Sequence, residues 1–519
     1  MSMPRIAFSS ADLLIHSLSY DLDRPVVTFN DTGRIVTARE FRDVISRYAQ
    51  ALRSKGLKKG ARVGLISRNR PEVLFVHGAI LFVDVCIVPL HPMGSIDDVA
   101  YMIEDAQIEA MIFDGSHYQD MARSLRRRIP RLKHWFALGS TDVGEDLAQV
   151  AESFPPVPLV PLHPDPEDIV RVSYSGGTTG RPKGIMGSAR YLQAMMDILL
   201  KEWEWPGEVR QLICSPLSHA GGTVFMPTML KGGSMVVLPG FDATAVLEAI
   251  QKHRITCVLV VPTMIYALLD HPRLGEYDLS SLEIIYYGSS LMSPSRLREG
   301  IEKLGPIFFQ FYGQGEAPMS VTTLKRSEHD PSDLKRLASC GRPVPWVRVR
   351  LLDDKGESVP DGEPGEICVQ GPLLMSGYLN QPEQTAEAFA GGWLHTGDIA
   401  IRDPDGFLRI VDRKKDMIIT GGFNVYPREV EDVLSSHPCV AAAAVIGVPH
   451  EKWGEAVKAI VVLRAGATVS EAELIALVRE RKGAVHAPKS LVFADRIPLS
   501  GLGKPDKKAL RAQYAGSST

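Results

Sequence analysis

The sequence lacks the paired cysteines of a disulfide-rich or zinc-binding protein. Its six cysteines stand singly along 519 residues. None forms a C-x-x-C pair, and none has a histidine beside it at the spacing of zinc ligands. Isolated thiols in a long chain are typical of a reducing compartment, where they remain free and are mostly buried. We therefore expect buried free thiols and a cytoplasmic protein.

Long hydrophobic runs are also missing. The most apolar stretch, residues 79–90, is interrupted by Asp84 and is too short to cross a bilayer. The first residues lead into no apolar segment as long as that of a signal peptide. We expect no stable membrane insertion.

Neither sign of charge dominates. The net charge is −3, with 23% charged and 45% hydrophobic residues. That composition is typical of a globular protein. It provides no basic surface for nucleic acid and no polybasic signal for anionic membranes. A chain of this length is expected to form at least two domains.

What is present is an alternation of helical and strand patterns, which predicts an α/β fold. Short β-branched runs that are apolar throughout favour strands buried on both faces, between helices with apolar residues at helical spacing. The predicted strands are 62–66, 110–113, 169–174, 257–261, 283–287 and 307–311, and the predicted helices include 37–57 and 72–82.

The alternation of helix and strand patterns ends after Val344. From there, short strand patterns separated by Asp-Gly and Pro-Gly turns predict a small antiparallel, β-barrel-like subdomain. The charged run 412–416 precedes a compact tail of mixed strands and helices. We therefore predict a large N-terminal domain of layered α/β sheets (1–411), a hinge (412–416) and a small α+β C-terminal domain (417–519).

A glycine-rich segment, residues 173–184, follows a predicted strand. Glycines let backbone N–H groups turn toward an anion, and hydroxyls and cations nearby add donors and charge. A flexible surface loop is the alternative interpretation. The segment is not a Walker loop, because no Gly-Lys-Ser/Thr ends it. The candidate phosphate-binding residues are Ser175, Gly176, Gly177, Thr178, Thr179, Gly180 and Lys183.

This segment resembles the phosphate loop of the adenylate-forming superfamily, which includes acyl-CoA synthetases, adenylation domains of peptide synthetases and luciferases. Six further motifs resemble that superfamily in the same order along the chain. They are 215–219, 288–290, 311–316, 393–398, 412–416 with 421–427, and 498–504. The resemblance implies an ATP-dependent enzyme that converts a carboxylic acid to an acyl-adenylate, releases pyrophosphate and transfers the acyl group to coenzyme A.

The resemblance also implies residue roles. The reaction joins two anions, so charge must be neutralised and both groups oriented. Glu316, with Thr179, is expected to hold Mg²⁺, a cation that prefers oxygen ligands. Lys504 is expected to reach the reacting carboxylate, and His219 to gate the acyl pocket. The remaining nucleotide contacts implied are Gly288, Ser289, Ser290, Tyr312, Gly313, Gln314, Gly315, Asp398 and Arg413.

Gly315 departs from the superfamily pattern, which has threonine there. The lost hydroxyl removes one charge-assisted hydrogen bond, worth roughly 1.5–3 kcal/mol. In the second half-reaction the C-terminal domain is expected to rotate about Lys415. Gly421, Gly422 and Phe423 would then line the path of coenzyme A.

For the acyl pocket the resemblance points to small and aromatic residues, and no charged side chain is evident among them. An amino acid would need an acidic partner and a dicarboxylate a cation. We therefore expect a medium- or long-chain fatty acid, or a bulky cyclic or aromatic acid. The residues are His219, Ala220, Gly221, Gly222, Thr223, Tyr287 and Gly288.

Two other functions stay open. The acyl group could go to a carrier protein, or the chain could be a nucleotide-binding regulator without catalysis. Retention of Lys504, Glu316 and Asp398 together speaks against the regulator. At the level of the family, a homodimer is expected. The sequence around Lys504 also resembles sites that protein acetyltransferases modify, which would remove the charge of that lysine.

Overall fold

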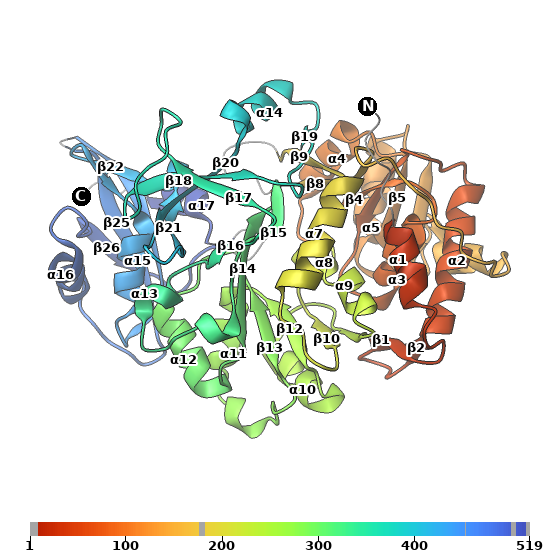
Figure 1. Cartoon of the computed structure of the whole chain (residues 1–519), viewed down its shortest axis with the longest axis horizontal. Coiled ribbons are helices and arrows are strands. Elements are labelled where there is room, and N and C mark those ends of the chain that lie inside the picture. The colour runs from red at the N-terminus through yellow and green to blue at the C-terminus, as the bar shows by residue number, and fades with distance from the viewer. Residues whose placement is uncertain (1–8, 176–181, 452, 500–504, 515–519) are drawn as a thin grey trace.

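The computed structural model describes residues 9–175, 182–451, 453–499 and 505–514, apart from the side chain of Lys415. The chain passes from two large sheets through a small sheet to a C-terminal α+β unit (Figure 1). The mixed α/β class predicted from the sequence is confirmed. Among the described residues, no helix is long and apolar enough to span a membrane.

The first large sheet is mostly parallel, in the order β19-β9-β8-β4-β3-β5-β6-β7. Its strands are β3 (Arg62–Ile66), β4 (Cys86–Pro89), β5 (Ala110–Asp114), β6 (His134–Leu138), β7 (Glu145–Asp146), β8 (Ile169–Tyr174), β9 (Gly184–Ser188) and β19 (Gly377–Tyr378). The helices among them are α1 (Ser10–Ser17), α2 (Ala38–Ser54), α3 (Pro71–Ile80), α4 (Ile96–Asp105), α5 (Gly115–Arg128), α6 (Leu147–Glu152) and α7 (Ala189–Glu202).

The second large sheet has the order β16-β15-β14-β13-β12-β10-β11-β1-β2. Its strands are β1 (Pro25–Phe29), β2 (Ile35–Thr37), β10 (Arg210–Ile213), β11 (Ser234–Val237), β12 (Cys257–Val260), β13 (Ile284–Tyr287), β14 (Phe308–Gln314), β15 (Ala317–Leu324) and β16 (Arg342–Pro343). The helices here are α8 (Ala220–Thr223), α9 (Phe225–Leu230), α10 (Ala243–His253), α11 (Pro262–Leu269), α12 (Pro294–Leu304) and α13 (Leu334–Leu337).

Local sequence explains these elements. Thr37 caps α2, because its side chain accepts from the backbone of Glu40 while the Glu40 carboxylate accepts from the backbone of Thr37. Central strands such as β5 are buried at every position, as their continuous apolar sequence predicts. Val63 of β3 and Leu259 of β12 belong to one buried cluster, so the two sheets share a core.

The small sheet is antiparallel, in the order β17-β18-β20-β21. It consists of β17 (Arg348–Leu352), β18 (Pro364–Gln370), β20 (Leu394–Arg402) and β21 (Leu408–Arg413), and α14 (Pro382–Ala388) lies between β19 and β20 in the chain. Register shifts interrupt the pairing of β20 with both of its neighbours. The small antiparallel subdomain predicted after Val344 is therefore present.

The C-terminal unit has a core of its own, which includes Val430, Leu474 and Leu491. Its junction with the large domain is polar: Arg428 Nη2 donates to the Met292 carbonyl at 2.8 Å. A polar junction between separate cores is typical of domains that move. The elements are β22 (Ile418–Thr420), β23 (Phe423–Val425), α15 (Pro427–Ser435), β24 (Val440–His450), β25 (Gly454–Leu463), α16 (Glu471–Lys482), β26 (Ser490–Phe493) and α17 (Lys507–Tyr514).

The cysteines are free, and five of the six are buried; Cys439 is partly exposed. The expectation of free, mostly buried thiols is thus confirmed.

A buried histidine predicts sensitivity of the fold to acid. His329 accepts at Nε2 from the Tyr287 hydroxyl (2.9 Å) when Nδ1–H donates to the Lys325 carbonyl (2.7 Å). Burial lowers its pKa from 6.5 to about 4. The unfolded chain therefore binds the proton more tightly. Neutral His329 therefore contributes about 3 kcal/mol to the free energy of unfolding. This contribution is complete above pH 6.5 and is lost as the pH falls toward 4.

We expect the free energy of unfolding in urea to fall between pH 6.5 and 4.5. The His329→Gln variant should show a shallower pH dependence over the same range, whatever its stability at neutral pH. Parallel curves for the two proteins would contradict this role of His329.

Candidate active site

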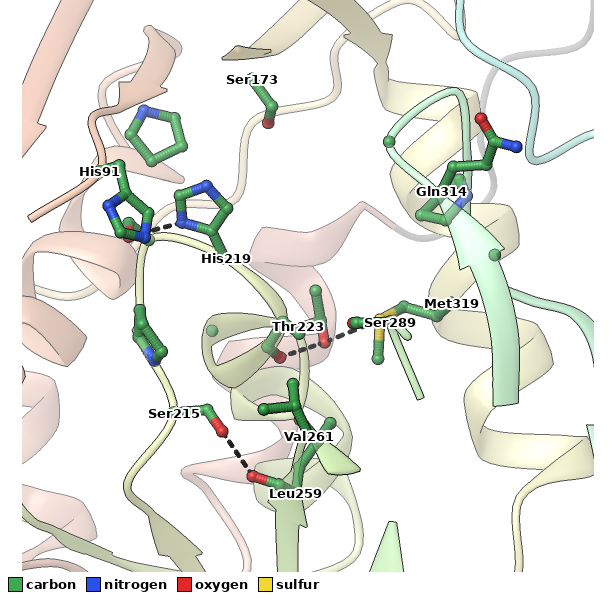
Figure 2. Close-up of a pocket in the computed structure, with 18 of the residues that line it drawn as sticks. His91, Ser173, Ser215, His219, Thr223, Leu259, Val261, Ser289, Gln314 and Met319 are labelled. Carbon is green, nitrogen blue, oxygen red and sulfur yellow. Dashed lines mark hydrogen bonds between the residues drawn. The ribbon is translucent and has the colours of Figure 1, made fainter. Parts of the chain in front are cut away.

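One large cavity lies where the two large sheets, the small sheet and the C-terminal unit meet. Its volume is about 2020 Å³. Residues expected at the nucleotide and residues expected at the acid line the same space, among them Ser289, Glu316, Asp398 and His219. Figure 2 shows His91 and His219 beside each other on one side of the cavity and Gln314 on the other. A single site can therefore hold both reactants.

The nucleotide end is built around Asp398, which is 5% exposed. Tyr312 donates its hydroxyl to Oδ2 at 2.7 Å, and Gln314 donates to the same oxygen at 3.1 Å. Arg413 Nε lies 3.0 Å from Oδ1. These partners fix the direction of the carboxylate. The strand β14 thus brings Tyr312 and Gln314 against residues of β20 and β21 that lie more than 80 positions later in the sequence.

Glu316 lies in the turn just before β15 and shares the cavity with Asp398. The Tyr378 hydroxyl donates to Glu316 Oε1 at 2.8 Å. The Lys183 ammonium lies 4.9 Å from the centre of the Tyr378 ring. Tyr378 therefore links the end of the phosphate segment to the expected metal ligand, a role that the sequence analysis missed. The only signal was an aromatic residue within a short strand.

Gly315 lies next to Glu316, and its neighbours limit what can replace it. A Cβ added at Gly315 would meet the Ile185 Cδ1 atom at 2.5 Å, closer than real Cβ atoms approach. The Gly315 carbonyl also accepts from the Tyr191 hydroxyl at 2.7 Å. The threonine that the superfamily has here therefore does not fit unless Ile185 moves.

We expect Gly315→Thr alone to reduce stability by about 0.5–1.5 kcal/mol, the cost of moving the end of the Ile185 side chain off its preferred rotamer. Adding Ile185→Val removes the clashing methyl group and should restore most of that stability. Adenylation by the double variant should equal or exceed that of the natural protein. Urea unfolding and pyrophosphate exchange measure the two quantities. A double variant as unstable as Gly315→Thr would exclude Ile185 as the obstacle.

The acyl end contains His219, whose Nδ1 lies 2.8 Å from the Ser218 hydroxyl. Burial lowers its pKa to about 3, so the ring is neutral near pH 7. The cavity is also lined by Ala220, Gly222 and Thr223. These residues occupy α8 and the turn before it, as their order in the sequence suggested.

Tyr287 does not line the cavity, in contrast to the expectation from the sequence. Its side chain is fully buried in the core around α10 to α12. Successive residues of a strand face opposite sides, and β13 turns Tyr287 toward these helices. Gly221 and Gly288 do not line the cavity either. A Cβ at Gly288 would lie 2.4 Å from the Phe311 carbonyl oxygen, so this glycine permits close packing of two strands.

The sequence analysis also missed three polar residues of the acyl end, His77, His91 and Arg171. The rings of His91 and His219 lie 4.7 Å apart in an edge-on arrangement. Burial lowers the pKa of His77 to about 3. Nothing in the local sequence marks these residues, because α3, β8 and the segment after β4 converge only in the folded chain.

Several expected residues lie outside the described part of the chain. They are Gly176, Gly177, Thr178, Thr179, Gly180, Lys504 and the side chain of Lys415. The residues beside two of these gaps are described: Ser175 and Pro182, and also Leu499 and Pro505, line the cavity. The remaining nucleotide residues Ser290 and Gly313 line it as well.

The expected hinge and coenzyme A residues lie at the start of the C-terminal unit. Lys414 Nζ contacts Asp354 at 2.6 Å on the small sheet. Gly421 and Gly422 form the turn between β22 and β23 with φ of 58° and 82°, a conformation that favours glycine. Phe423 beside them is 61% exposed.

Glu366, Cys368 and His395 form the one group of three possible metal ligands among the described residues. Cys368 on β18 pairs directly with His395 on β20. Lys414 Nζ, however, lies 3.5 Å from Glu366 Oε2 and supplies positive charge to that carboxylate. Glu366 Oε1 also accepts from the backbone N–H of Gly397, next to Asp398, at 2.9 Å, so we interpret the group as a hydrogen-bonded support of that segment.

Comparison with known families identifies the class of protein. Residues 16–379 match the AMP-binding enzyme family, and residues 429–504 match the AMP-binding enzyme C-terminal domain. The chain belongs to the AMP-binding enzyme family.

Individual relatives agree with this assignment. The chain is 49% identical over 515 residues to the medium/long-chain-fatty-acid–CoA ligase FadD8 of Mycobacterium tuberculosis, covering 97% of this chain and 89% of that protein. It is 37% identical to feruloyl-CoA synthase of an Amycolatopsis species, covering 93% and 94%. The amide bond synthetase McbA of Marinactinospora thermotolerans has the same fold, with a TM-score of 0.89, 34% identity and coverage of 97% and 100%. The predicted membership of the adenylate-forming superfamily and the predicted AMP-forming acid–thiol ligase are confirmed.

Proposed function

We propose that this protein activates a medium- or long-chain fatty acid, or a bulky cyclic acid, with ATP and transfers the acyl group to coenzyme A. The single observation that carries the proposal is the shared cavity, which joins Glu316 and Asp398 to an acyl compartment. Apolar side chains of α7 and α9, including Met195, Met196 and Phe225, line that compartment. The fatty-acid and feruloyl substrates in the names of the relatives support the choice of acid.

In the first step Asp398 accepts the ribose hydroxyls, and Ser289 and Ser290 lie along the base. Tyr312 and Gln314 hold Asp398 in place, and Arg413 balances its charge. The proposed magnesium ion would be held by Glu316 and Thr179 and would supply positive charge to the phosphates. Glu316 is only partly buried, and Tyr378 contacts both its carboxylate and the Lys183 ammonium, an arrangement that suits a site for a metal–phosphate complex.

In the second step the C-terminal unit rotates about residues 412–416 and withdraws Lys504. Two features support this movement: the separate core and the polar junction, in which Arg464 Nη1 lies 3.5 Å from Asp270. Polar contacts exchange for water at little cost. Gly421, Gly422 and the exposed Phe423 would then face the arriving thiol.

AMP release and pyrophosphate exchange across a panel of acids test the proposal. Exchange should be strongest with medium or long aliphatic acids, or bulky cyclic acids, that carry no charge besides the reacting carboxylate. Coenzyme A should accelerate AMP release and form the acyl thioester. A product formed only with carrier protein would favour the carrier-protein alternative. Absence of exchange with every acid would exclude the proposed activity.

Three further predictions remain proposals. They are a cytoplasmic location, a homodimer, and regulation by acetylation of Lys504, which would remove the charge that the first step needs. Mass spectrometry of Lys504 after incubation with acetyl-CoA and a protein acetyltransferase tests the last of them, and an unmodified lysine would contradict it.

A further inference from the structure

Arg171 is a partly buried cation in the acyl end of the cavity. It lies on β8, and with Ser173 it faces the cavity, while Val172 between them packs into the core on the other side. Arg171 Nε donates to the Ser173 hydroxyl at 2.8 Å, and Nη2 donates to the Ser218 carbonyl at 2.9 Å. These two bonds fix the direction of the guanidinium but do not neutralise it.

No carboxylate neutralises Arg171. None of the described Asp or Glu residues forms an ion pair with it, and the groups that act on its charge, Tyr191 and Cys86, are both neutral near pH 7. None of the residues outside the described ranges is Asp or Glu. A partly buried guanidinium that faces the cavity without a carboxylate partner can still form a charge-assisted hydrogen bond, so the site is suited to an anion that arrives with a ligand.

The other titratable groups nearby do not supply that anion. His77 and His219 are neutral, because burial and the charge of Arg171 lower the pKa of each to about 3. The His77 Nε2 and His91 Nε2 atoms are buried without a hydrogen-bond partner. The surroundings thus combine one fixed cation with two unpaired ring nitrogens. A carboxylate, which accepts hydrogen bonds, matches that set.

The position of Arg171 connects it to both reactants. Ser173 is the first residue of the glycine-rich segment 173–184, and Ser218 precedes His219. Tyr191, which neighbours Arg171, donates to the Gly315 carbonyl beside Glu316. We propose that Arg171 is a carboxylate-docking residue, which binds a carboxylate of the acid substrate through its guanidinium before adenylation. This inference rests on the proposed function.

The decisive variant is Arg171→Met in the full-length protein. Loss of a charge-assisted bond to the carboxylate should raise the KM for the acid in pyrophosphate exchange by about 10- to 100-fold, with the KM for ATP unchanged. Thioester formation from supplied acyl-adenylate should be unchanged, because that compound has no free carboxylate. Arg171→Lys keeps the charge, so its KM for the acid should lie between that of the natural protein and that of Arg171→Met. Arg190→Met is the matched control, because Arg190 is already paired with Glu167 at 2.7 Å outside the cavity.

Dodecanoic and dodecanedioic acid distinguish which carboxylate is bound. A higher KM for both acids indicates the reacting carboxylate, and a higher KM for the diacid alone indicates the distal one; either result supports docking. An unchanged KM for both acids, in a natural protein that is active, would overturn the inference and leave the proposed function intact. If Arg171→Met and Arg171→Lys both reduced pyrophosphate exchange and thioester formation equally, Arg171 would have a structural role. That result would also overturn the inference. Inactivity of the natural protein with every acid would overturn both proposals.

Discussion

Replacing Lys504 with alanine is expected to reduce acyl-adenylate formation by about 100- to 1000-fold and to leave thioester formation from supplied acyl-adenylate nearly unchanged. Losing one group aimed at the charge of a transition state typically has an effect of that size. Lys504 lies outside the described residues, but Leu499 and Pro505 on either side of its segment line the cavity that holds Glu316. The described residues on both sides of this gap therefore lie at the cavity.

Separate half-reaction assays test this expectation. Pyrophosphate exchange reports the first step, and thioester formation from acyl-adenylate and coenzyme A reports the second. Lys482→Ala is a suitable control, because Lys482 belongs to the same domain and contacts Glu429 away from the cavity at 2.9 Å. Comparable loss in both steps would contradict a lysine that serves only the first.

The second large effect is expected at Glu316. Glu316→Gln keeps the size of the side chain but removes its charge, so adenylation should fall by about 100-fold or more and should need more magnesium for half-maximal rate. Tyr378→Phe removes only the hydrogen bond to Glu316 Oε1. The rate of adenylation by that variant should fall about fivefold, as expected for the loss of one hydrogen bond.

Rates measured over a range of magnesium concentrations, and after chelation of the metal, separate these cases. Chelation should abolish adenylation in the natural protein. If Glu316→Gln had the same magnesium requirement as the natural protein, Glu316 would not be a metal ligand. If Tyr378→Phe were as damaged as Glu316→Gln, the tyrosine would act directly rather than through the carboxylate.

The acyl end shows where reasoning from the sequence failed. Tyr287 was expected to form an aromatic wall of the pocket, yet its hydroxyl hydrogen-bonds to His329 in the core. The absence of charged residues from the motifs suggested an uncharged pocket, yet Arg171 lines it. Both errors have the same origin. A motif indicates that a backbone segment is near the site, but the pleat of the strand decides which side chain faces the cavity.

The order of motifs, the α/β class and the position of the small sheet followed from the sequence alone, because local periodicity and glycine placement depend on neighbouring residues. The sequence also singled out Asp398, Glu316 and Arg413. Only the tertiary structure decided what surrounds them: Tyr312 and Gln314 on Asp398, Tyr378 on Glu316, and an unpaired Arg171 among histidines. The contacts of Asp398 and Glu316 join residues from different sheets. Their distances and charges depend on how the layers pack, which no local pattern encodes.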